Sequence, residues 1–370
     1  MRYALIIAGG SGTRLWPMSR SDVPKQLIPF IQGKSLLDIA FQRLDGLIPA
    51  SRRYVCAGIK HREAILSALP ELEKENFLGE PVGRDTLNAI GLGAALLHAK
   101  DPDAVFAVFT ADHLIEPVDK FQKIIEQGFA LVERDPQTKV TFGITPTGPA
   151  TSYGYLELGE SIPGGGKIVK RFKEKPALAV AEEYFRKGPE HYLWNSGMFV
   201  WSAATLLDCI KFFEGDVFMG LMKISQAWDT PRRDPVIAEI YPALKKISID
   251  FAIMEPVSRY KQASRLSQSR VVAIPMELDW LDVGSWPSYA QTCPHDENGN
   301  AIAAGKCLLS DASNCLMASS EPDHLIAMMG CQDLVVIHTK NATLICPAGK
   351  AERIKDLYNE AEKQFGGEFT

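Results

Sequence analysis

The first stretch of the chain whose residue types could do chemistry is GGSGTRLWPMSRSDVPKQL, from Gly9 to Leu27, directly after an apolar run. Glycine takes positive φ angles easily and lets a ligand approach the backbone, and consecutive backbone N–H groups can hold an anion. Arg14 and Lys25 follow in the same stretch, and both side-chain types bind phosphate. The stretch therefore predicts a phosphate-binding loop, with an ordinary strand-to-helix turn as the plain alternative. Its predicted nucleotide-binding residues are Gly9, Gly10, Gly12, Thr13, Arg14 and Lys25.

Two familiar phosphate-binding patterns do not fit this loop. The pattern GxxxxGK[ST] needs a Lys-Ser or Lys-Thr pair, and the sequence has none at that spacing. The dinucleotide pattern GxGxxG is matched by Gly10 and Gly12, but Leu15 stands at the third glycine position. No strand with a terminal acidic residue follows about twenty residues later, as a ribose-binding pair would require. The remaining phosphate-binding interpretation is a loop that places backbone donors around a nucleotide.

A carboxylate follows the apolar run at residues 105–111. If that run is a parallel strand, Asp112 lies at the carboxyl edge of the sheet, where ligands bind in open α/β folds. An oxygen ligand there suits Mg²⁺, which bridges phosphates. Position alone leaves a helix N-cap or a solvated strand end as alternatives. For His113, the next residue, we expect a structural hydrogen bond rather than a role as base or metal ligand.

Seven further segments occur in the order known from one enzyme family. They are GEPVGRDTLNAI (79–90), TADHLI (110–115), GITPTGPATSYGYLE (143–157), FKEKP (172–176), WNSGMFVW (194–201), SIDFAIME (248–255) and DWLDVGSW (279–286). On these segments and the opening loop, the chain resembles the sugar-1-phosphate nucleotidyltransferases, and the resemblance covers roughly residues 1–350. The Trp-Pro and Pro-Lys-Gln steps of the loop are most similar to the mannose-1-phosphate guanylyltransferases within that family.

The resemblance implies that mannose 1-phosphate attacks the α-phosphorus of GTP, giving GDP-mannose and pyrophosphate, with Mg²⁺ as the cofactor. The attacking oxygen is already an anion at neutral pH, so the site has to position two polyanions and stabilise charge. Two alternatives stay open. One is the same reaction with another hexose 1-phosphate or another nucleotide. The other is a non-catalytic regulatory subunit, against which the presence of Lys25, Asp112 and Asp282 speaks.

The resemblance also implies roles for charged residues of this sequence. Lys25 matches the catalytic lysine that contacts the triphosphate, and Arg14 matches a residue that holds the β- and γ-phosphates. Asp112 and Asp282 match the two carboxylates that hold Mg²⁺, and Asp279 is a rival position three residues before Asp282. The predicted catalytic residues are therefore Lys25, Arg14, Asp112 and Asp282.

For the base, the candidate is Glu80. A carboxylate satisfies the N1–H and N2–H₂ donors that guanine presents on one edge, and a purine without those donors would leave it unpaired. Arg84, Asp85 and Asn88 are predicted to bind the nucleotide beside it. The chain departs from the family at Leu87-Asn88, where Ala-Pro is usual.

For the sugar phosphate, the resemblance implies four residues. Lys175 holds the phosphate, and Glu174 accepts hydrogen bonds from sugar hydroxyls. Neighbouring side chains on a strand point to opposite faces, so both can face the ligand only if the strand ends or bulges there, and Pro176 favours an end. Asn195 can donate and accept, which suits a vicinal diol, and Gly154 lets the backbone approach the sugar ring.

Apolar runs alternate with helix-like segments in the first part of the chain. The runs lie at 3–8, 54–58, 105–113 and 140–144, and the helix-like segments lie at 61–69 and 86–100. Continuous apolar runs are typical of parallel strands buried on both faces. We therefore predict an α/β fold with a Rossmann-like, mostly parallel mixed sheet flanked by helices.

The pattern changes after residue 145. We expect antiparallel strands at 153–161 and 167–176, helices at 177–188 and 202–216, and a terminal helix at 350–366. From about residue 290 the chain is a series of short apolar segments with polar turns, which fits a small β domain or a partial left-handed β-helix. The predicted domains are a catalytic domain, 1–290, and a small C-terminal β domain with a terminal helix, 291–370.

The composition bounds the partners. A formal net charge of −5 and the lack of a basic run argue against nucleic acid. Seven cysteines at irregular spacing, with no CxxC pair, predict reduced thiols and a cytoplasmic protein, and no segment is long enough to span a membrane. The predicted partners are GTP, mannose 1-phosphate, GDP-mannose, pyrophosphate and a second copy of the chain in a homodimer. We expect the C-terminal β segment either to cover the active-site domain or to mediate the dimer contact. The family's long version carries an extra cupin-type isomerase domain, for which this sequence of 370 residues is too short. We therefore expect the short, single-activity form.

Overall fold

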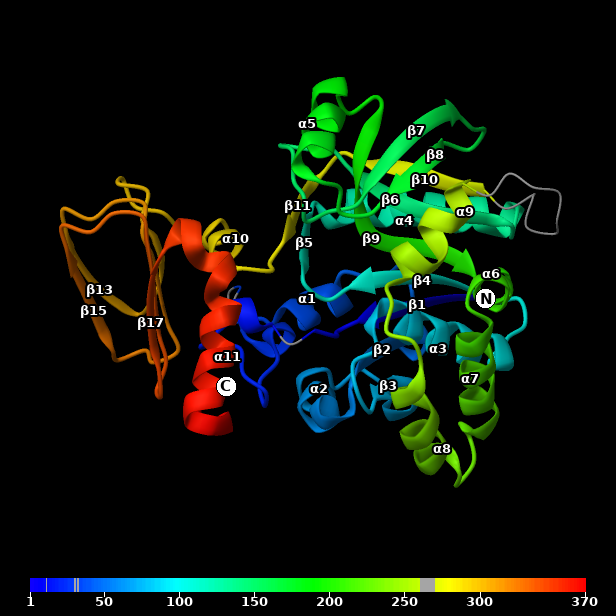
Figure 1. Ribbon diagram of the computed structural model, residues 1–370, viewed down its shortest axis with the longest axis horizontal. Helices are drawn as coiled ribbons and strands as arrows, with labels where there is room; N and C mark the ends of the chain where they lie inside the picture. Colours follow the sequence, from blue (N-terminus) through cyan, green and yellow to red (C-terminus); the bar gives the residue numbers. More distant parts are fainter. Residues whose placement is uncertain (11, 30, 32, 260–269) are drawn as a thin grey trace. The chain divides into compact units, whose positions relative to one another are not determined.

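The computed structural model describes residues 1–10, 12–29, 31, 33–259 and 270–370. The chain forms two compact units and passes between them several times. The first unit consists of Met1–Gly9, Ala40–Ala111 and Ile115–Trp280, and the second of Gly10–Ile39, Asp112–Leu114 and Leu281–Thr370. Figure 1 follows the chain through the elements of both units.

A nine-stranded mixed sheet forms the centre of the first unit. Its strands in spatial order are β3 (Phe77–Glu80), β2 (Arg53–Gly58), β1 (Arg2–Ile7), β4 (Val105–Thr110), β9 (Tyr192–Ser202), β6 (Thr138–Ile144), β10 (Arg270–Met276), β8 (Lys167–Lys173) and β7 (Tyr155–Ser161). The strands from β3 to β4 pair in parallel, as do β6 and β10, whereas β9 is antiparallel to β4 and β6. The predicted α/β class is confirmed, and so is the antiparallel pair of β7 and β8.

Helices cover both faces of this sheet. They are α2 (Arg62–Ala68), α3 (Asp85–Lys100), α4 (Val118–Arg134), α5 (Leu178–Lys187), α6 (Ala203–Phe213), α7 (Gly215–Ala227), α8 (Arg233–Ile240) and α9 (Glu255–Arg259), while α1 (Leu36–Gln42) contains a unit boundary. A Cβ on Gly93 of α3 would lie 2.5 Å from Leu5, and one on Gly128 of α4 would lie 3.0 Å from Phe142. The strand register puts Leu5 and Phe142 on opposite faces. Glycines therefore let α3 and α4 pack closely on opposite sides of the sheet.

Two predicted helices differ from those in the structure. The helical pattern at 202–216 breaks at Glu214, whose backbone (φ −137°, ψ 60°) is not helical, so it forms α6 and α7 instead of one helix. Both helices contact α3. The terminal helix also begins later than predicted, because Ala348–Arg353 is a 3₁₀ segment and α11 runs over Ile354–Phe365.

The second unit contains a small β domain wound mostly from parallel strands. These are β12 (Ala301–Ala303), β13 (Lys306–Ser310), β14 (Leu316–Ser319), β15 (Leu325–Met329), β16 (Leu334–His338) and β17 (Thr343–Pro347). Strands β12, β14 and β16 pair in parallel in one sheet, β13 and β15 pair in parallel in another, and β17 is antiparallel to β16. Alternation between two parallel sheets is the winding of a β-helix, and α11 lies beside β17 in Figure 1. The small β domain is confirmed, and the handedness of its winding stays a prediction.

The glycine loop belongs to the second unit because its apolar residues enter that unit's core. Leu15 and Trp16 share a buried cluster with Val335 of β16. Trp286, the first residue of α10 (Trp286–Ala290), is completely buried, and its indole N–H donates to the Trp16 carbonyl at 3.0 Å. Trp286 is therefore a core residue of this unit.

Two of the unit boundaries fall within short strands. β5 (His113–Glu116) and β11 (Asp279–Asp282) form a two-stranded sheet, and each strand contains a boundary. The predicted domains, 1–290 and 291–370, divide the chain by family pattern rather than by contacts and stay a prediction. In the part of the chain that the structure describes, no helix combines the length and the apolar character needed to cross a membrane.

Candidate active site

An ion pair lies in the charged cluster of the second unit. Lys25 Nζ is 2.7 Å from Asp112 Oδ2, and the lysine side chain is only 11 % exposed. Burial alone would raise the pKa of Asp112, but the positive charges of Lys25 and His113 outweigh burial and lower the pKa to about 2. Asp112 is therefore ionised at neutral pH, as a carboxylate has to be to bind a metal.

Asp282 and His113 complete a group that could hold a metal ion. One ligand atom each from Asp112, His113 and Asp282 lie within 4.8 Å of one another. Burial, and then the negative charge of Asp112, raise the pKa of Asp282 to about 6. Two carboxylates at such spacing repel unless a cation lies between them, so the donor set fits a divalent metal. We expected only a structural role for His113, yet its Nε2 lies 3.9 Å from Asp112 Oδ1, inside this group.

The backbone of the glycine loop passes close to the Lys25 side chain. Gly12 has a φ of 61°, and a Cβ at that position would lie 2.8 Å from Lys25 Cβ. Ser19 Oγ donates to the Gly12 carbonyl at 2.5 Å, and Pro24, with φ −66°, precedes the 3₁₀ turn that Lys25 begins. Gly10 also has a positive φ, 100°. Glycine at position 12 is thus required both by the backbone angle and by the space that the lysine occupies.

Arg14 has an exposed partner in the same unit. Its Nη1 donates to Glu352 Oε2 at 2.9 Å, and the two side chains are 48 % and 68 % exposed. Exposed ion pairs contribute only about 0–1 kcal/mol, so Arg14 can exchange this carboxylate for a phosphate at little cost. Its predicted contact with the β- and γ-phosphates stays a prediction.

In the first unit, Glu80 ends β3 and is 6 % exposed. Burial raises the pKa of Glu80, and the hydrogen bond from the Tyr241 hydroxyl to its Oε1, at 2.6 Å, opposes that rise. A Cβ on Gly9 would lie 3.9 Å from the other carboxylate oxygen, Oε2. Tyr241 was not among the predicted residues. It lies 161 positions from Glu80, and no local pattern in the sequence connects the two.

The other predicted base-site residues organise the start of α3. Asp85 has a φ of 67°, and its Oδ1 accepts the N–H of the next residue at 2.8 Å. Asn88 is fully buried, and its Nδ2 donates to the carbonyls of Arg84 (2.7 Å) and Lys245 (2.9 Å). These contacts make Asn88 a brace for the loop before the helix. The predicted contacts of Arg84, Asp85 and Asn88 with a nucleotide stay a prediction.

Glu174 and Lys175 come directly after β8. Lys175 has a φ of 41°, so the strand conformation ends there, as the following proline predicted. Its Nζ is 3.2 Å from Glu174 Oε1, and the two side chains are 59 % and 7 % exposed. Burial raises the pKa of Glu174, and the charge of Lys175 opposes the rise. A Cβ on Gly154 would lie 2.5 Å from Glu174 Oε2, so a glycine is needed beside this carboxylate.

Asn195 is held at both ends of its side-chain amide. Its Nδ2 donates to Asp250 Oδ1 at 3.0 Å, and its Oδ1 accepts from the Thr141 hydroxyl at 2.7 Å. Burial, and then the charge of Glu174, raise the pKa of Asp250 to about 7. Asp250 begins a π-helical turn, a conformation frequent at functional sites. Asp250 was not predicted, although an aspartate inside the apolar segment SIDFAIME was a usable signal.

The structure divides the predicted site residues between the two units. Those in the second unit are Gly10, Gly12, Thr13, Arg14, Lys25, Asp112 and Asp282, and those in the first are Gly9, Glu80, Arg84, Asp85, Asn88, Gly154, Glu174, Lys175 and Asn195. The group in the second unit supplies cations and metal-binding carboxylates, which suit phosphate chemistry. The group in the first unit supplies buried carboxylates and an oriented amide, which suit recognition of N–H and O–H groups.

Comparisons with known proteins identify the family of the chain. The family model described as Nucleotidyl transferase matches residues 3–299, and the model described as MannoseP isomerase/GMP-like beta-helix domain matches residues 305–360. The mannose-1-phosphate guanylyltransferase of Escherichia coli K12 is 33% identical over 367 residues, which cover 97% of this chain and 73% of that protein. The mannose-1-phosphate guanylyltransferase ManC of Salmonella typhimurium LT2 is 34% identical over 365 residues, with 96% and 72% covered.

One solved structure is similar over nearly the whole length. It is a crystal structure from Thermus thermophilus, described as a mannose-1-phosphate geranyltransferase. The two chains are 29% identical with a TM-score of 0.83, and the match covers 98% of this chain and 99% of that one.

Proposed function

The chain belongs to the nucleotidyl transferase family, and from this premise we propose that it transfers GMP from GTP to mannose 1-phosphate, giving GDP-mannose and pyrophosphate. The observation that carries the proposal is the cluster of Lys25, Asp112 and Asp282. These residues come from distant parts of the sequence, the resemblance implies catalytic roles for all of them, and they lie together in one compact unit. The names of the relatives from Escherichia coli and Salmonella support the choice of substrates.

Asp112 and Asp282 are the residues that would hold Mg²⁺. Bound to their carboxylates, Mg²⁺ supplies positive charge to the phosphate oxygens. Because Mg²⁺ prefers oxygen ligands, we assign His113 a supporting role as a charge partner of Asp112 rather than a place among the ligands. The raised pKa of Asp282 supports this assignment, since burial and the nearby Asp112 disfavour its charge until a cation compensates.

The protein's own part in the reaction is positioning and charge stabilisation. A phosphate oxygen of mannose 1-phosphate forms a bond to the α-phosphorus of GTP, while the bond from that phosphorus to the β-phosphate bridging oxygen breaks and pyrophosphate leaves. Lys25 turns from Asp112 to the triphosphate and stabilises the charge that develops there. Arg14 holds the β- and γ-phosphates, which become the leaving group. No side chain has to remove a proton from the nucleophile.

Recognition of the two substrates falls to the residues of the first unit. Glu80 accepts the N1–H and N2–H₂ donors of guanine, and the Tyr241 hydroxyl keeps that carboxylate oriented. Glu174 and Asn195 bind sugar hydroxyls, and Lys175 binds the phosphate of mannose 1-phosphate. The hydrogen bonds of Asn195 to Asp250 and Thr141 support this role, because they fix which way its amide faces.

We also propose that the chain forms a homodimer through the outer face of β13 and β15. Leu308, Leu325 and Met329 are 63%, 52% and 78% exposed, and the parallel register puts all three on that face. An exposed apolar face of this kind is typical of protein interfaces. A cytoplasmic location is the accompanying proposal, supported by seven unpaired thiols and nucleotide substrates.

The proposed activity is tested by pyrophosphate release from the purified protein with Mg²⁺. GTP, ATP, UTP and dTTP are each combined with mannose 1-phosphate and with glucose 1-phosphate. We expect the highest kcat/KM for GTP with mannose 1-phosphate. A preference for UTP or dTTP, or no release with any pair, would contradict the proposal.

A further inference from the structure

The second unit contains a pocket for which the proposed reaction has no use. Its volume is about 800 Å³, within the range of roughly 300–1,000 Å³ found for small-molecule sites. It is lined by residues between Pro17 and Ile31, by residues between Tyr289 and Pro294, and by the small β domain. The reaction described above therefore leaves this pocket without a ligand.

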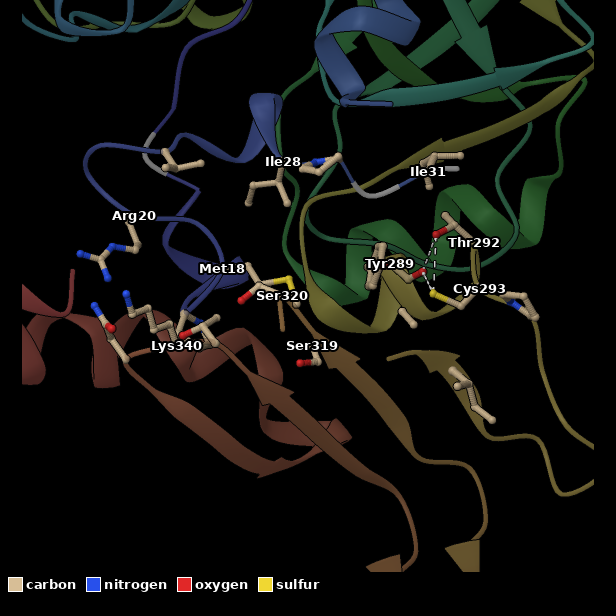
Figure 2. Close-up of a pocket in the computed structure, with 18 residues that line it drawn as sticks. Met18, Arg20, Ile28, Ile31, Tyr289, Thr292, Cys293, Ser319, Ser320 and Lys340 are labelled. Carbon is tan, nitrogen blue, oxygen red and sulfur yellow. Dashed lines mark hydrogen bonds between the residues drawn. The ribbon is translucent and has the colours of Figure 1, made fainter. Parts of the chain in front are cut away.

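The charged residues that line the pocket are all positive. Figure 2 shows Arg20 and Lys340 on one side of it, and Tyr289, Thr292 and Cys293 on the other. Among the lining residues that the structure describes, none is acidic. Two cations in a wall whose described residues include no carboxylate attract an anion, and arginine and lysine are the side chains that bind phosphate.

Arg20 keeps donors for a ligand. Its Nη2 donates to the Glu368 carbonyl at 2.9 Å, and its Nε lies 3.4 Å from Asp22 Oδ1. A guanidinium carries five N–H donors, so these contacts leave others for a phosphate. The carboxylate of Asp22 is 69% exposed, which makes it a weak competitor.

The rest of the pocket wall fits a larger molecule than an inorganic anion. Met18, Ile28 and Ile302 give it apolar surface, and Ser319 and Thr339 border it with hydroxyl groups. A phosphate ion alone would leave most of a volume of about 800 Å³ to water. A flat, weakly polar body attached to the phosphate would cover the apolar wall.

We propose that this pocket binds a nucleoside phosphate at a second site, apart from the residues of the reaction. The phosphate lies between Arg20 and Lys340, and the base lies against the apolar wall. The described lining offers no carboxylate to read the donor edge of guanine, so the pocket accepts adenine as well as guanine. ADP is therefore a suitable probe, because Glu80 at the proposed main site selects against adenine.

Occupancy of the pocket affects the segment that carries Lys25. Val23 and Ile28, on either side of Lys25, line the pocket, and Lys25 is paired with Asp112 in this arrangement. A ligand that fits this arrangement favours it over others. Because Lys25 has to leave Asp112 to contact the triphosphate, a nucleotide in the pocket slows the reaction. This consequence, unlike the binding itself, rests on the proposed function.

Calorimetric titration of the full chain with ADP, in saturating GDP-mannose to fill the main site, tests the binding. We expect one ADP per chain. The double variant Arg20→Gln/Lys340→Gln lowers the affinity at least about 10-fold, since it removes charge-assisted hydrogen bonds. Ser320→Trp fills the pocket from an exposed lining position and also removes binding. The matched control, Lys355→Gln on the exposed surface of α11, leaves it unchanged.

The outcomes separate the parts of the proposal. No ADP binding, or binding unchanged in the double variant and in Ser320→Trp, overturns the site. Thermal melts test whether each variant is folded. The two variants change different parts of the pocket, so if one of them does not fold, the other still tests the site. If inorganic phosphate binds as tightly as ADP, the nucleoside assignment is wrong. ADP lowers kcat in the wild type but not in the double variant; if it lowers neither, the coupling to Lys25 is wrong while the site stands.

Discussion

At the scale of single residues, charge placement decides the chemistry. Asp112 is neutralised by Lys25 and keeps a pKa of about 2, whereas Asp282, beside the same carboxylate, has a pKa of about 6. Without a metal the two aspartates thus differ in pKa, and a divalent cation between them would favour the charged form of both. Substitutions within this cluster should act on catalysis and metal affinity rather than mainly on folding.

Replacement of Lys25 by glutamine removes the cation that turns to the triphosphate. We expect kcat to fall by about 100- to 1,000-fold, the loss typical when one preorganised charge-stabilising donor is removed. Lys123→Gln is the control, because that lysine is 79% exposed on α4 and pairs only with Asp119 among the ion pairs of the described residues. Steady-state kinetics of both variants decide. A Lys25→Gln enzyme within threefold of the control would exclude the catalytic role.

Asp282 and Asp279 offer a matched pair for the metal assignment. Asp282→Asn should raise the Mg²⁺ concentration for half-maximal activity by more than about 10-fold, since metal affinity falls at least that much when its supporting groups are changed. Asp279→Asn, at the exposed start of β11, should leave it nearly unchanged. Mn²⁺ binding, measured by electron paramagnetic resonance without substrates, should likewise be weaker in Asp282→Asn than in Asp279→Asn. Equal effects at both positions would argue against Asp282 as a ligand.

The raised pKa of Asp250 makes the free energy of unfolding fall as the pH rises. Its folded-state pKa is about 7, above its ordinary value of 3.8, so the folded protein holds a proton that the unfolded chain has lost. The stability this proton provides is complete below pH 3.8 and is lost as the pH rises to about 7, by at most about 1.4 kcal/mol per pH unit. Asp250→Asn should therefore gain unfolding free energy relative to wild type between pH 5 and pH 8 in denaturant titrations. A relative loss over that range would contradict the raised pKa.

At the scale of elements, the glycine loop matters through its backbone. Gly12→Ala places a methyl group 2.8 Å from Lys25 Cβ at a φ of 61°, whereas Gly46→Ala meets no atom within 4 Å at a φ of 81°. Both variants should lose about 1 kcal/mol of unfolding free energy, the cost of a side chain at positive φ, and Gly12→Ala should lose more because its methyl group collides with Lys25. Only Gly12→Ala should also lower kcat, by at least about tenfold, because a displacement near 1 Å costs that much or more. Equal kcat values for the two variants would contradict a positioning role for the loop.

The elements were predictable where the signal was local. Continuous apolar runs predicted β1, β2, β4 and β6, and the family segments led to Lys25, Asp112 and Asp282. The break at Glu214 had a local signal that was missed, because Gly215, a poor helix former, follows it directly. Tyr241 had no such signal, since its partner Glu80 lies 161 positions away.

At the scale of the whole molecule, the division into units was the least predictable feature. The predicted catalytic domain contains Gly10–Ile39, but these residues are part of the compact unit that also holds the small β domain. Apolar residues such as Leu15 and Trp16 show in the sequence that the loop packs somewhere, but they do not show against which core. Only the folded chain reveals that Trp286 is a partner of the loop, to which it donates a hydrogen bond at the Trp16 carbonyl.

The proposed homodimer is a prediction for the molecule as a whole. Leu308→Glu/Met329→Glu places charges on the exposed face of β13 and β15, where the two side chains are 63% and 78% exposed. We expect light scattering to show a dimer for wild type and a monomer for the variant at micromolar concentration, with unchanged thermal stability of each chain. Leu178→Glu, at a 55% exposed position on α5, should stay dimeric. A monomeric wild type, or a dimeric double variant, would contradict the proposed interface.

The most direct measurement is the fate of the α-phosphate of GTP. GTP labelled at that phosphorus is incubated with mannose 1-phosphate, Mg²⁺ and the enzyme, and the products are separated by chromatography. If GMP is transferred as proposed, the label appears in GDP-mannose, in equal amount to the unlabelled pyrophosphate released, and Asp112→Asn abolishes both. Label in free GMP or GDP, or no mannose-dependent product, would contradict the transfer.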